Sequence, residues 1–375
     1  MINIVPGSHA DRLIRLLALT GEFPYCSLRM VGNERQLRKL VHEMTAPQEY
    51  RNPSTGEKKT VRLLSLSGKG AERTIRFYRR AFPILEWVGC LESYLARTHG
   101  HRFSGDAAHR ERNHRVAESV AMMIRAEVEC RPESLPRLQI QRIHPVIPER
   151  PVFYSSTDLK NAGENEANKT MYTRLTGALF AGRNCYSVYN SRDRAMKWNG
   201  MGEFKARQWV TELARLNSTV YSVDEAILLF QSDQSAIQTI LGTENSREFR
   251  FDAVYPHVYF VPMDDWGIRQ LRIMTLPDWK EWELDILFNP EDRTGNLGRF
   301  ESDAFVDGRY VFSFLDGDLA RLIRLREGAP KEETIELICY PHQVPLVRAL
   351  FESAVSLRTV ELDQVEEDLL ERSAP

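Results

Sequence analysis

The chain has 375 residues, of which 42% are hydrophobic and 27% are charged, and its formal net charge at pH 7 is −2. This length suits two or three domains, and this composition excludes a disordered or collagen-like chain. Because no run of 18 apolar residues occurs and residues 1–7 lack the features of a signal peptide, we expect a cytoplasmic protein without a membrane span.

The charge is unevenly distributed along the chain. Residues 1–80 contain 15 Lys and Arg against 7 Asp and Glu, a net charge of +8, whereas residues 301–375 contain 8 against 16, a net charge of −8. The two ends therefore suit different partners: a polyanion at the basic end, and a protein or a second copy of the chain at the acidic one.

Residues 1–80 are predicted to contain three helices followed by a hairpin. Leucines at i, i+3 and i+4 indicate a first helix that ends near Gly21, and a short second helix spans about residues 25–31. The third begins at Asn33, an N-cap residue with Gln36 three positions later, as in a capping box. Its apolar positions repeat with helical spacing and form the buried face: Leu37, Leu40, Val41 and Met44.

The hairpin has a first strand at residues 48–51, a turn at 52–56 that contains Asn, Pro and Gly, and a second strand at 58–66. Three helices and a hairpin in this order are typical of a winged helix-turn-helix domain. We predict such a domain at residues 1–80, with the third helix as the recognition helix and the hairpin as the wing.

Hydrogen-bond donors and cations gather on these two elements. On the third helix, the donors that face away from the core suit the major groove: Arg35, Gln36, Arg38, Lys39 and His42. On or beside the hairpin, the cations suit phosphates: Arg51, Lys58, Lys59 and Arg62. These residues predict binding to double-stranded DNA. The alternative is a winged helix that contacts protein and leaves its basic face solvated.

Residues 81–131 are predicted as a helical connector and residues 132–151 as an extended linker, because the prolines of the linker forbid a continuous helix. The connector region holds four histidines: His99, His101, His109 and His114. His109 and His114 would point to different sides of one helix, and the five cysteines form no C-x-x-C pair. We therefore predict no metal site.

Residues 152–375 are predicted as an α/β domain. Short buried strands, each followed by a polar turn and a helix, are expected at residues 226–230, 257–261, 310–314 and 335–339. This alternation indicates a mixed, largely parallel sheet. Residues 185–189 and 195–198 flank a polar turn and are predicted as a hairpin attached to that sheet.

Two acid-x-Lys triplets, Asp158-Leu159-Lys160 and Glu203-Phe204-Lys205, have the form found in PD-(D/E)xK nucleases. Such enzymes bind Mg²⁺ through converging carboxylates beside a lysine. One alternative function is therefore a magnesium-dependent nuclease that uses Asp158, Glu203 and Lys205. The simpler interpretation is that both acids stabilise helix starts, so we assign no catalytic residue and expect no cofactor.

Further aspartates follow the predicted strands: Asp233, Asp264, Asp265, Asp316 and Asp318. Ligands bind at the carboxyl ends of parallel strands, but aspartates there are also ordinary helix caps, and we predict caps. No nucleotide-binding motif occurs. Three tryptophans are predicted to pack in the core: Trp266, Trp279 and Trp282.

Three segments, in this order, carry a family resemblance: Arg62–Gly70, His109–Glu118 and Phe153–Ser156. They resemble the replication-relaxation proteins of bacterial plasmids and integrative conjugative elements. Residues 169–180 and 185–205 look like the part that such proteins share with restriction-endonuclease-like folds. The resemblance covers about residues 8–230. It implies a DNA-binding accessory protein of a mobile element, in replication, conjugative transfer or their regulation, and it does not imply catalysis. A transcription regulator whose α/β domain senses an effector is a further alternative.

Overall fold

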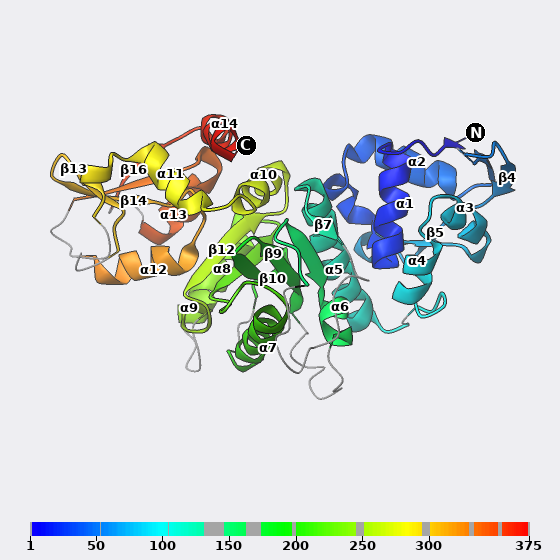
Figure 1. The fold of residues 1–375 in the computed structure, drawn as a ribbon, viewed down its shortest axis with the longest axis horizontal. Coiled ribbons are helices and arrows are strands. Elements are labelled where there is room, and N and C mark those ends of the chain that lie inside the picture. The colour runs from blue at the N-terminus through cyan, green and yellow to red at the C-terminus, as the bar shows by residue number, and fades with distance from the viewer. Residues whose placement is uncertain are drawn as a thin grey trace. The chain divides into compact units, whose positions relative to one another are not determined.

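The computed structural model (Figure 1) describes residues 2–52, 54–103, 105–130, 146–162, 174–196, 200–244, 251–294, 301–329, 334–351 and 355–373. The chain forms two compact units, Met1–Pro136 with Phe153–Ala162, and Arg137–Val152 with Gly163–Pro375. It is a mixed α/β protein with several sheets. Among the described helices, none is long and apolar enough to cross a membrane.

The N-terminal unit begins with the helices that the sequence predicts. α1 ends at Gly21, whose φ is +77° and whose N–H donates to the Leu17 carbonyl. The second predicted helix is a 3-10 helix. α2 begins at Asn33, whose side chain accepts the Gln36 N–H at 3.1 Å. The bounds are α1 His9–Thr20, the 3-10 helix Tyr25–Met30 and α2 Glu34–Met44.

Six short strands of this unit form two sheets. One sheet has the order β1-β3-β4 and contains the predicted hairpin, β3–β4, and the other has the order β2-β6-β5. The bounds are β1 Ile2–Asn3, β2 Glu22–Pro24, β3 Gln48–Arg51, β4 Lys58–Val61, β5 Leu64–Ser67 and β6 Thr74–Phe77.

The predicted strand at residues 58–66 is wrong as one element, because it is broken at Arg62 and Leu63 into β4 and β5. In a regular strand, successive side chains point to opposite faces. Leu63 and Leu64 are both fully buried, and the Leu63 N–H donates to the Met44 carbonyl at the end of α2. The break allows both leucines to enter the core, and it starts a second hairpin, β5–β6.

The helices predicted as a connector pack within the N-terminal unit: α4 contacts α1, and α5 contacts α1 and β2. Polar side chains tie α5 to the 3-10 helix and to β6, since Ser27 donates to buried Glu118 at 2.5 Å and Thr74 is hydrogen-bonded to buried His114 at 3.0 Å. The bounds are α3 Phe82–Trp87, α4 Leu91–Arg97, α5 Ala107–Arg125, β7 Glu129–Cys130, β8 Val152–Ser155 and α6 Ser156–Asn161. Most of the predicted linker, residues 131–145, lies outside the described residues.

The largest sheet has six strands in the order β12-β11-β10-β9-β8-β7. β10, β11 and β12 are parallel, and β9 is antiparallel to β10. The bounds of the elements in this part are β9 Leu175–Ala181, β10 Asn184–Arg192, α7 Met201–Asn217, β11 Glu225–Phe230, α8 Asp233–Glu244, α9 Phe251–Val254, β12 His257–Pro262, α10 Asp265–Met274 and α11 Trp279–Leu287. The hairpin predicted for residues 185–198 is therefore wrong: β10 pairs with the strand before it, through a turn at Gly182 and Arg183.

A second sheet of the C-terminal unit has the order β13-β14-β15-β16, in which β14, β15 and β16 are parallel and β13 is antiparallel to β14. The bounds are β13 Ala304–Val306, β14 Arg309–Ser313, α12 Leu319–Gly328, β15 Ile335–Cys339, α13 Val344–Phe351, β16 Ser356–Thr359 and α14 Leu362–Ser373. All four strands predicted in this region are confirmed, but they lie in two sheets rather than in one.

Four strands of the six-stranded sheet, β9–β12, repeat the strand order of β13–β16. Each set of four begins with an antiparallel hairpin and continues with two further strands, parallel to the second hairpin strand and joined to it and to each other through helices. The repeats meet through β12: the Phe260 N–H donates to the Gly317 carbonyl at 2.9 Å, and the Val258 N–H donates to the Asp318 carboxylate at 3.1 Å. Helices α8 and α13, one from each repeat, contact each other.

Candidate nucleic-acid interface

Helix α2 separates an apolar face from a polar one, as predicted. Leu37, Val41 and Met44 are fully buried, and Leu40 is half-buried. The predicted groove-facing residues are all exposed: Arg35, Gln36, Arg38, Lys39 and His42. The helix therefore presents hydrogen-bond donors over about two turns without losing its packing.

The Tyr25 ring connects α2 to the turn between β5 and β6. The guanidinium carbon of Arg38, on α2, lies 5.1 Å from the ring centre, and that of Arg73, at the end of the turn, lies 5.3 Å from it. Both distances allow cation–π attraction. The exposed face of α2 and the β5–β6 turn are thus adjacent, and each contributes a cation to the same aromatic ring.

The DNA contacts predicted from the sequence do not include the β5–β6 turn. Gly68 has φ +81°, and a Cβ atom there would lie 2.7 Å from the Glu72 carbonyl oxygen, so the turn requires glycine. Lys69 in this turn is exposed. The run Ser67-Gly68-Lys69-Gly70 is a turn signal that could have separated β5 from β6.

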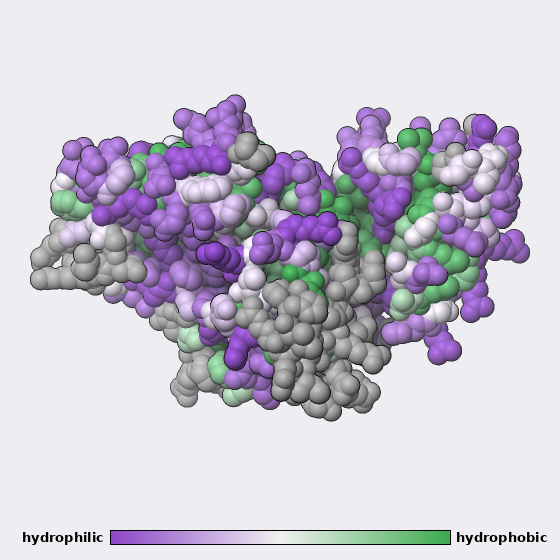
Figure 2. All heavy atoms as spheres, viewed as in Figure 1, coloured by the Kyte–Doolittle hydropathy of each residue, from purple (hydrophilic) through white to green (hydrophobic). Residues whose placement is uncertain are grey.

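The β3–β4 hairpin places its cations on both of its faces. Arg51 is directly opposite Lys58, whereas Lys59 is opposite the buried Tyr50. Side chains alternate along a strand, so Arg51 and Lys58 share one face. Lys59 points the other way, with its ammonium 5.2 Å from the Trp87 ring centre. Figure 2 shows hydrophilic residues over the edge of this unit where β4 lies.

Several of these cations are paired with carboxylates on the surface: Arg38 with Glu34, Lys39 with Glu43, Lys58 with Glu49 and Lys59 with Glu57. The hydrogen bond that Arg38 donates to the Glu34 carboxylate raises the pKa of Arg38 above its ordinary value, so Arg38 is charged at neutral pH. Exposed pairs of this kind contribute about 0–1 kcal/mol, so phosphates can replace the carboxylates at little cost. Arg35 forms no ion pair with the residues that the structure describes. Arg62 is exposed and lies over the Tyr78 ring.

The three candidate nuclease residues do not belong to one unit of the structure. Asp158 is in the N-terminal unit, where it accepts the Ser155 N–H and hydroxyl in a capping box. Glu203 is in the C-terminal unit, buried and paired with Arg174 at 3.1 Å. Lys205 is exposed on the same helix as Glu203, and residues two apart on a helix point in different directions. Within the described ranges, no group of three His, Cys, Asp or Glu residues is placed to hold a metal ion.

Two of the five aspartates predicted as helix caps are N-caps in the structure. Asp264 caps α10 by accepting the Gly267 N–H, and Asp318 caps α12 by accepting the N–H groups of Ala320 and Arg321. Asp233 and Asp265 lie in the first turns of α8 and α10, and Asp316 accepts the Asp318 N–H at 2.9 Å. The prediction for the tryptophans holds for buried Trp279, which donates to the Tyr186 hydroxyl at 3.1 Å. It is wrong for Trp266, which is 37% exposed.

The chain matches no protein-family model, no curated protein and no solved structure.

Proposed function

We propose that the N-terminal unit is a winged-helix module that binds double-stranded DNA, with α2 in the major groove and the β5–β6 turn as the wing. In a winged helix, the strand after the first helix pairs with the second strand of the wing hairpin. The sheet order β2-β6-β5 supports this assignment, because β2 follows α1 and β5–β6 is the hairpin. The wing turn then lies at residues 68–73, between β5 and β6, rather than at the predicted residues 52–56, and β3–β4 is a second basic projection.

The observation that carries the proposal is the position of Arg38 and Arg73 over one Tyr25 ring. A recognition helix needs donors for base edges, and a wing needs cations for the flanking phosphates. Here the two sets are adjacent, and the net charge of +8 over residues 1–80 adds a long-range attraction for DNA.

The resemblance to replication-relaxation proteins suggests the cellular role. We propose that the chain acts in plasmid replication, conjugative transfer or their regulation, in the cytoplasm of a bacterium. The net charge of −8 over residues 301–375 repels phosphates, so we propose that this part faces a protein partner or a second copy of the chain. A restriction-endonuclease-like fold for the α/β part stays a prediction. The nuclease alternative gains no support, because Glu203 is buried and Lys205 is exposed on the same helix.

The proposal is tested by measuring the anisotropy of a labelled duplex with the full-length protein and two variants. In the first variant, Arg35, Arg38 and Arg73 are replaced by Ala. In the second, which is the control, Arg215→Ala removes an exposed arginine from α7 in the other unit. We expect the triple variant to bind duplex at least about a hundredfold more weakly, since each lost contact costs about 1 kcal/mol or more, and the control to bind like the wild type. Equal losses in both variants would contradict the assignment.

A further inference from the structure

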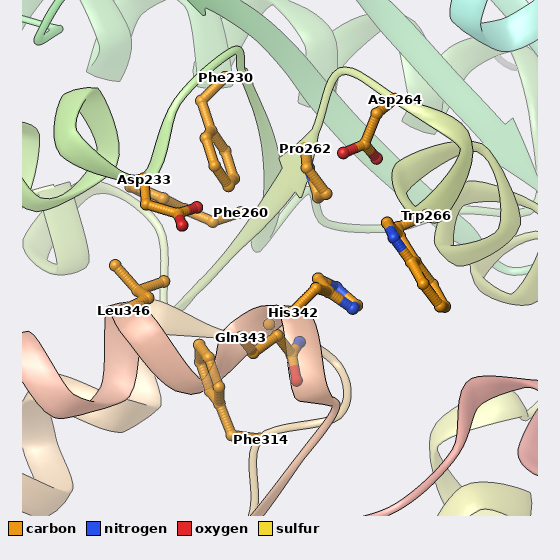
Figure 3. Close-up of a pocket in the computed structure, with 11 residues that line it drawn as sticks. Phe230, Asp233, Phe260, Pro262, Asp264, Trp266, Phe314, His342, Gln343 and Leu346 are labelled. Atoms are coloured by element: carbon orange, nitrogen blue, oxygen red, sulfur yellow. The ribbon is translucent and has the colours of Figure 1, made fainter.

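A pocket of about 210 Å³ lies between the two repeats of the C-terminal unit (Figure 3). It opens where four parallel strands end: Phe230 and Pro262 are the last residues of β11 and β12, Phe314 follows β14, and His342 comes shortly after β15. The carboxyl ends of parallel strands are where α/β proteins bind ligands. Two such edges, one from each sheet, contribute to this single pocket.

Aromatic rings form much of the pocket wall. Phe230, Phe260 and Phe314 contribute apolar surface. The Trp266 and His342 rings are stacked, with their centres 5.1 Å apart and their planes 19° from parallel. Such a wall suits a flat or apolar group, and its π faces attract cations.

Two carboxylates enter the pocket from opposite sides. Figure 3 shows the side chains of Asp233 and Asp264 turned toward its interior. Asp264 uses one oxygen to cap α10, and the Asp233 carboxylate has no hydrogen bond or ion pair with any described residue. Burial, and then the charge of Asp264, raise the pKa of Asp233, so the two groups repel each other. No lysine or arginine is among the described residues that line the pocket.

His342 adds polar atoms that lack a partner. Both of its ring nitrogens are buried, and neither forms a hydrogen bond within the described part of the chain. Burial lowers the pKa of His342 below its ordinary value, so the ring is neutral at pH 7 and offers one donor and one acceptor. A buried polar atom without a partner costs about 1–3 kcal/mol, which a ligand in this pocket recovers.

We propose that this pocket binds a small organic cation, an amine or guanidinium compound with a flat or apolar body. The cation relieves the repulsion between Asp233 and Asp264, while the body lies against the aromatic wall. The volume corresponds to roughly seven waters at about 30 Å³ each, so the ligand is the size of an aryl amine rather than of a nucleotide. The charge also excludes phosphates, because Asp264 already occupies the N-terminus of α10.

The site goes beyond DNA binding and does not depend on it. A ligand pocket in the α/β part supports the alternative that the chain is a regulator whose α/β domain senses an effector. All the residues that line the pocket belong to the C-terminal unit, so ligand binding does not depend on how the two units are placed relative to each other.

Calorimetric titration of the full-length protein tests the proposal. Three cations are titrated: phenethylamine, agmatine and benzamidine. Two analogues of phenethylamine serve as controls, neutral phenethyl alcohol and anionic hydrocinnamate. We expect at least one cation to bind saturably. The alcohol and the acid should bind at least about tenfold more weakly than phenethylamine, because they cannot donate a charge-assisted hydrogen bond to the carboxylates. No binding by any of the three cations, or equal binding of the amine, the alcohol and the acid, overturns the proposal.

Variants locate the site. Asp233→Asn and Asp264→Asn should each weaken cation binding about tenfold. Asn is as good an N-cap as Asp, so α10 keeps its start in the second variant, and circular dichroism checks that both fold. Glu291→Gln, at an exposed carboxylate of the same unit, should leave binding unchanged. Unaltered binding in both aspartate variants, or an equal loss in the Glu291 control, rules out this pocket.

Discussion

The guanidinium carbon of Arg73 lies 5.3 Å from the centre of the Tyr25 ring. Because Arg38 lies over the same ring, this contact links the exposed face of α2 to the turn between β5 and β6. The ring restricts two long side chains that would otherwise sample many rotamers, and under the proposed function it would preorganise their charges for DNA.

The first prediction concerns this ring. Tyr25→Leu should weaken duplex binding about five- to thirtyfold, because it removes two cation–π contacts that each contribute about 0.5–1 kcal/mol at an exposed site. Tyr25→Phe keeps the ring and should bind nearly as the wild type does. Anisotropy titrations compare the three proteins, and a phenylalanine variant as weak as the leucine variant would show that the ring is not what orders the arginines.

The second prediction separates the roles of α2 and the β3–β4 hairpin. Arg38→Ala should cost about 1–3 kcal/mol on the preferred sequence and relax the sequence preference, because arginine contacts base edges in bidentate fashion. Lys58→Ala should weaken binding to all sequences alike and lower the salt dependence. Lys59→Ala is the matched control, since Lys59 points to the opposite face of the hairpin. Selection from a randomised duplex pool measures the preference, and the same change of preference in the Arg38 and Lys58 variants would refute the division.

The third prediction concerns the start of α10. A Cβ atom on Gly267 would lie 1.7 Å from the Pro262 carbonyl oxygen, so Gly267→Ala forces β12 and α10 apart. We expect a loss of about 1–3 kcal/mol in the free energy of unfolding. Gly242 in α8 has no atom within 4 Å of its Cβ position, so Gly242→Ala should instead stabilise by about 0.5–1 kcal/mol. Urea denaturation of both variants checks the signs, and a neutral Gly267→Ala would contradict the close approach.

The fourth prediction is a pH dependence at Asp316. Burial raises its pKa to about 6, while Arg321, 3.6 Å away, opposes the rise. A carboxyl group whose pKa is raised in the folded state loses stability as the pH rises from its unfolded pKa through its folded one, here from about 4 to about 6. Asp316→Asn should therefore be more stable than the wild type by about 3 kcal/mol at about pH 8 and show no gain at about pH 4. Thermal unfolding across this range measures the difference, and an equal gain at both pH values would show that ionisation is not the cause.

Local signals in the sequence predicted much of the fold. Gly21 and Asn33 mark helix ends through backbone and capping chemistry that involves only their neighbours, and the short apolar runs marked the strands of the α/β part. Strand partners depend on contacts between distant residues, so the division of those strands into two sheets was not predictable from the runs. The strand break at Leu63 was not predictable for the same reason, because it depends on the contact between Leu63 and Met44, which are distant in the sequence.

Sequence reasoning about the sites failed where position in space matters more than residue type. Trp266 has the composition of a core residue, yet it stacks on His342 at the pocket. Glu203 and Lys205 are two apart, as in a nuclease strand, but they lie on a helix, as the simpler interpretation of that triplet expected. The groove-facing residues of α2 were found because helical spacing alone defines its exposed face.

The central claim is that the N-terminal unit binds duplex DNA through cations on α2 and the β5–β6 turn. The most direct test is the affinity of the full-length protein for duplex DNA over a range of salt concentrations. About five phosphate contacts give a slope of about −4.5 in a plot of log K against log salt. We predict a slope near this value for the wild type and a shallower one for Lys69→Ala, whose side chain lies in the turn. A salt-independent affinity, or no binding to duplex at low salt, would contradict the account.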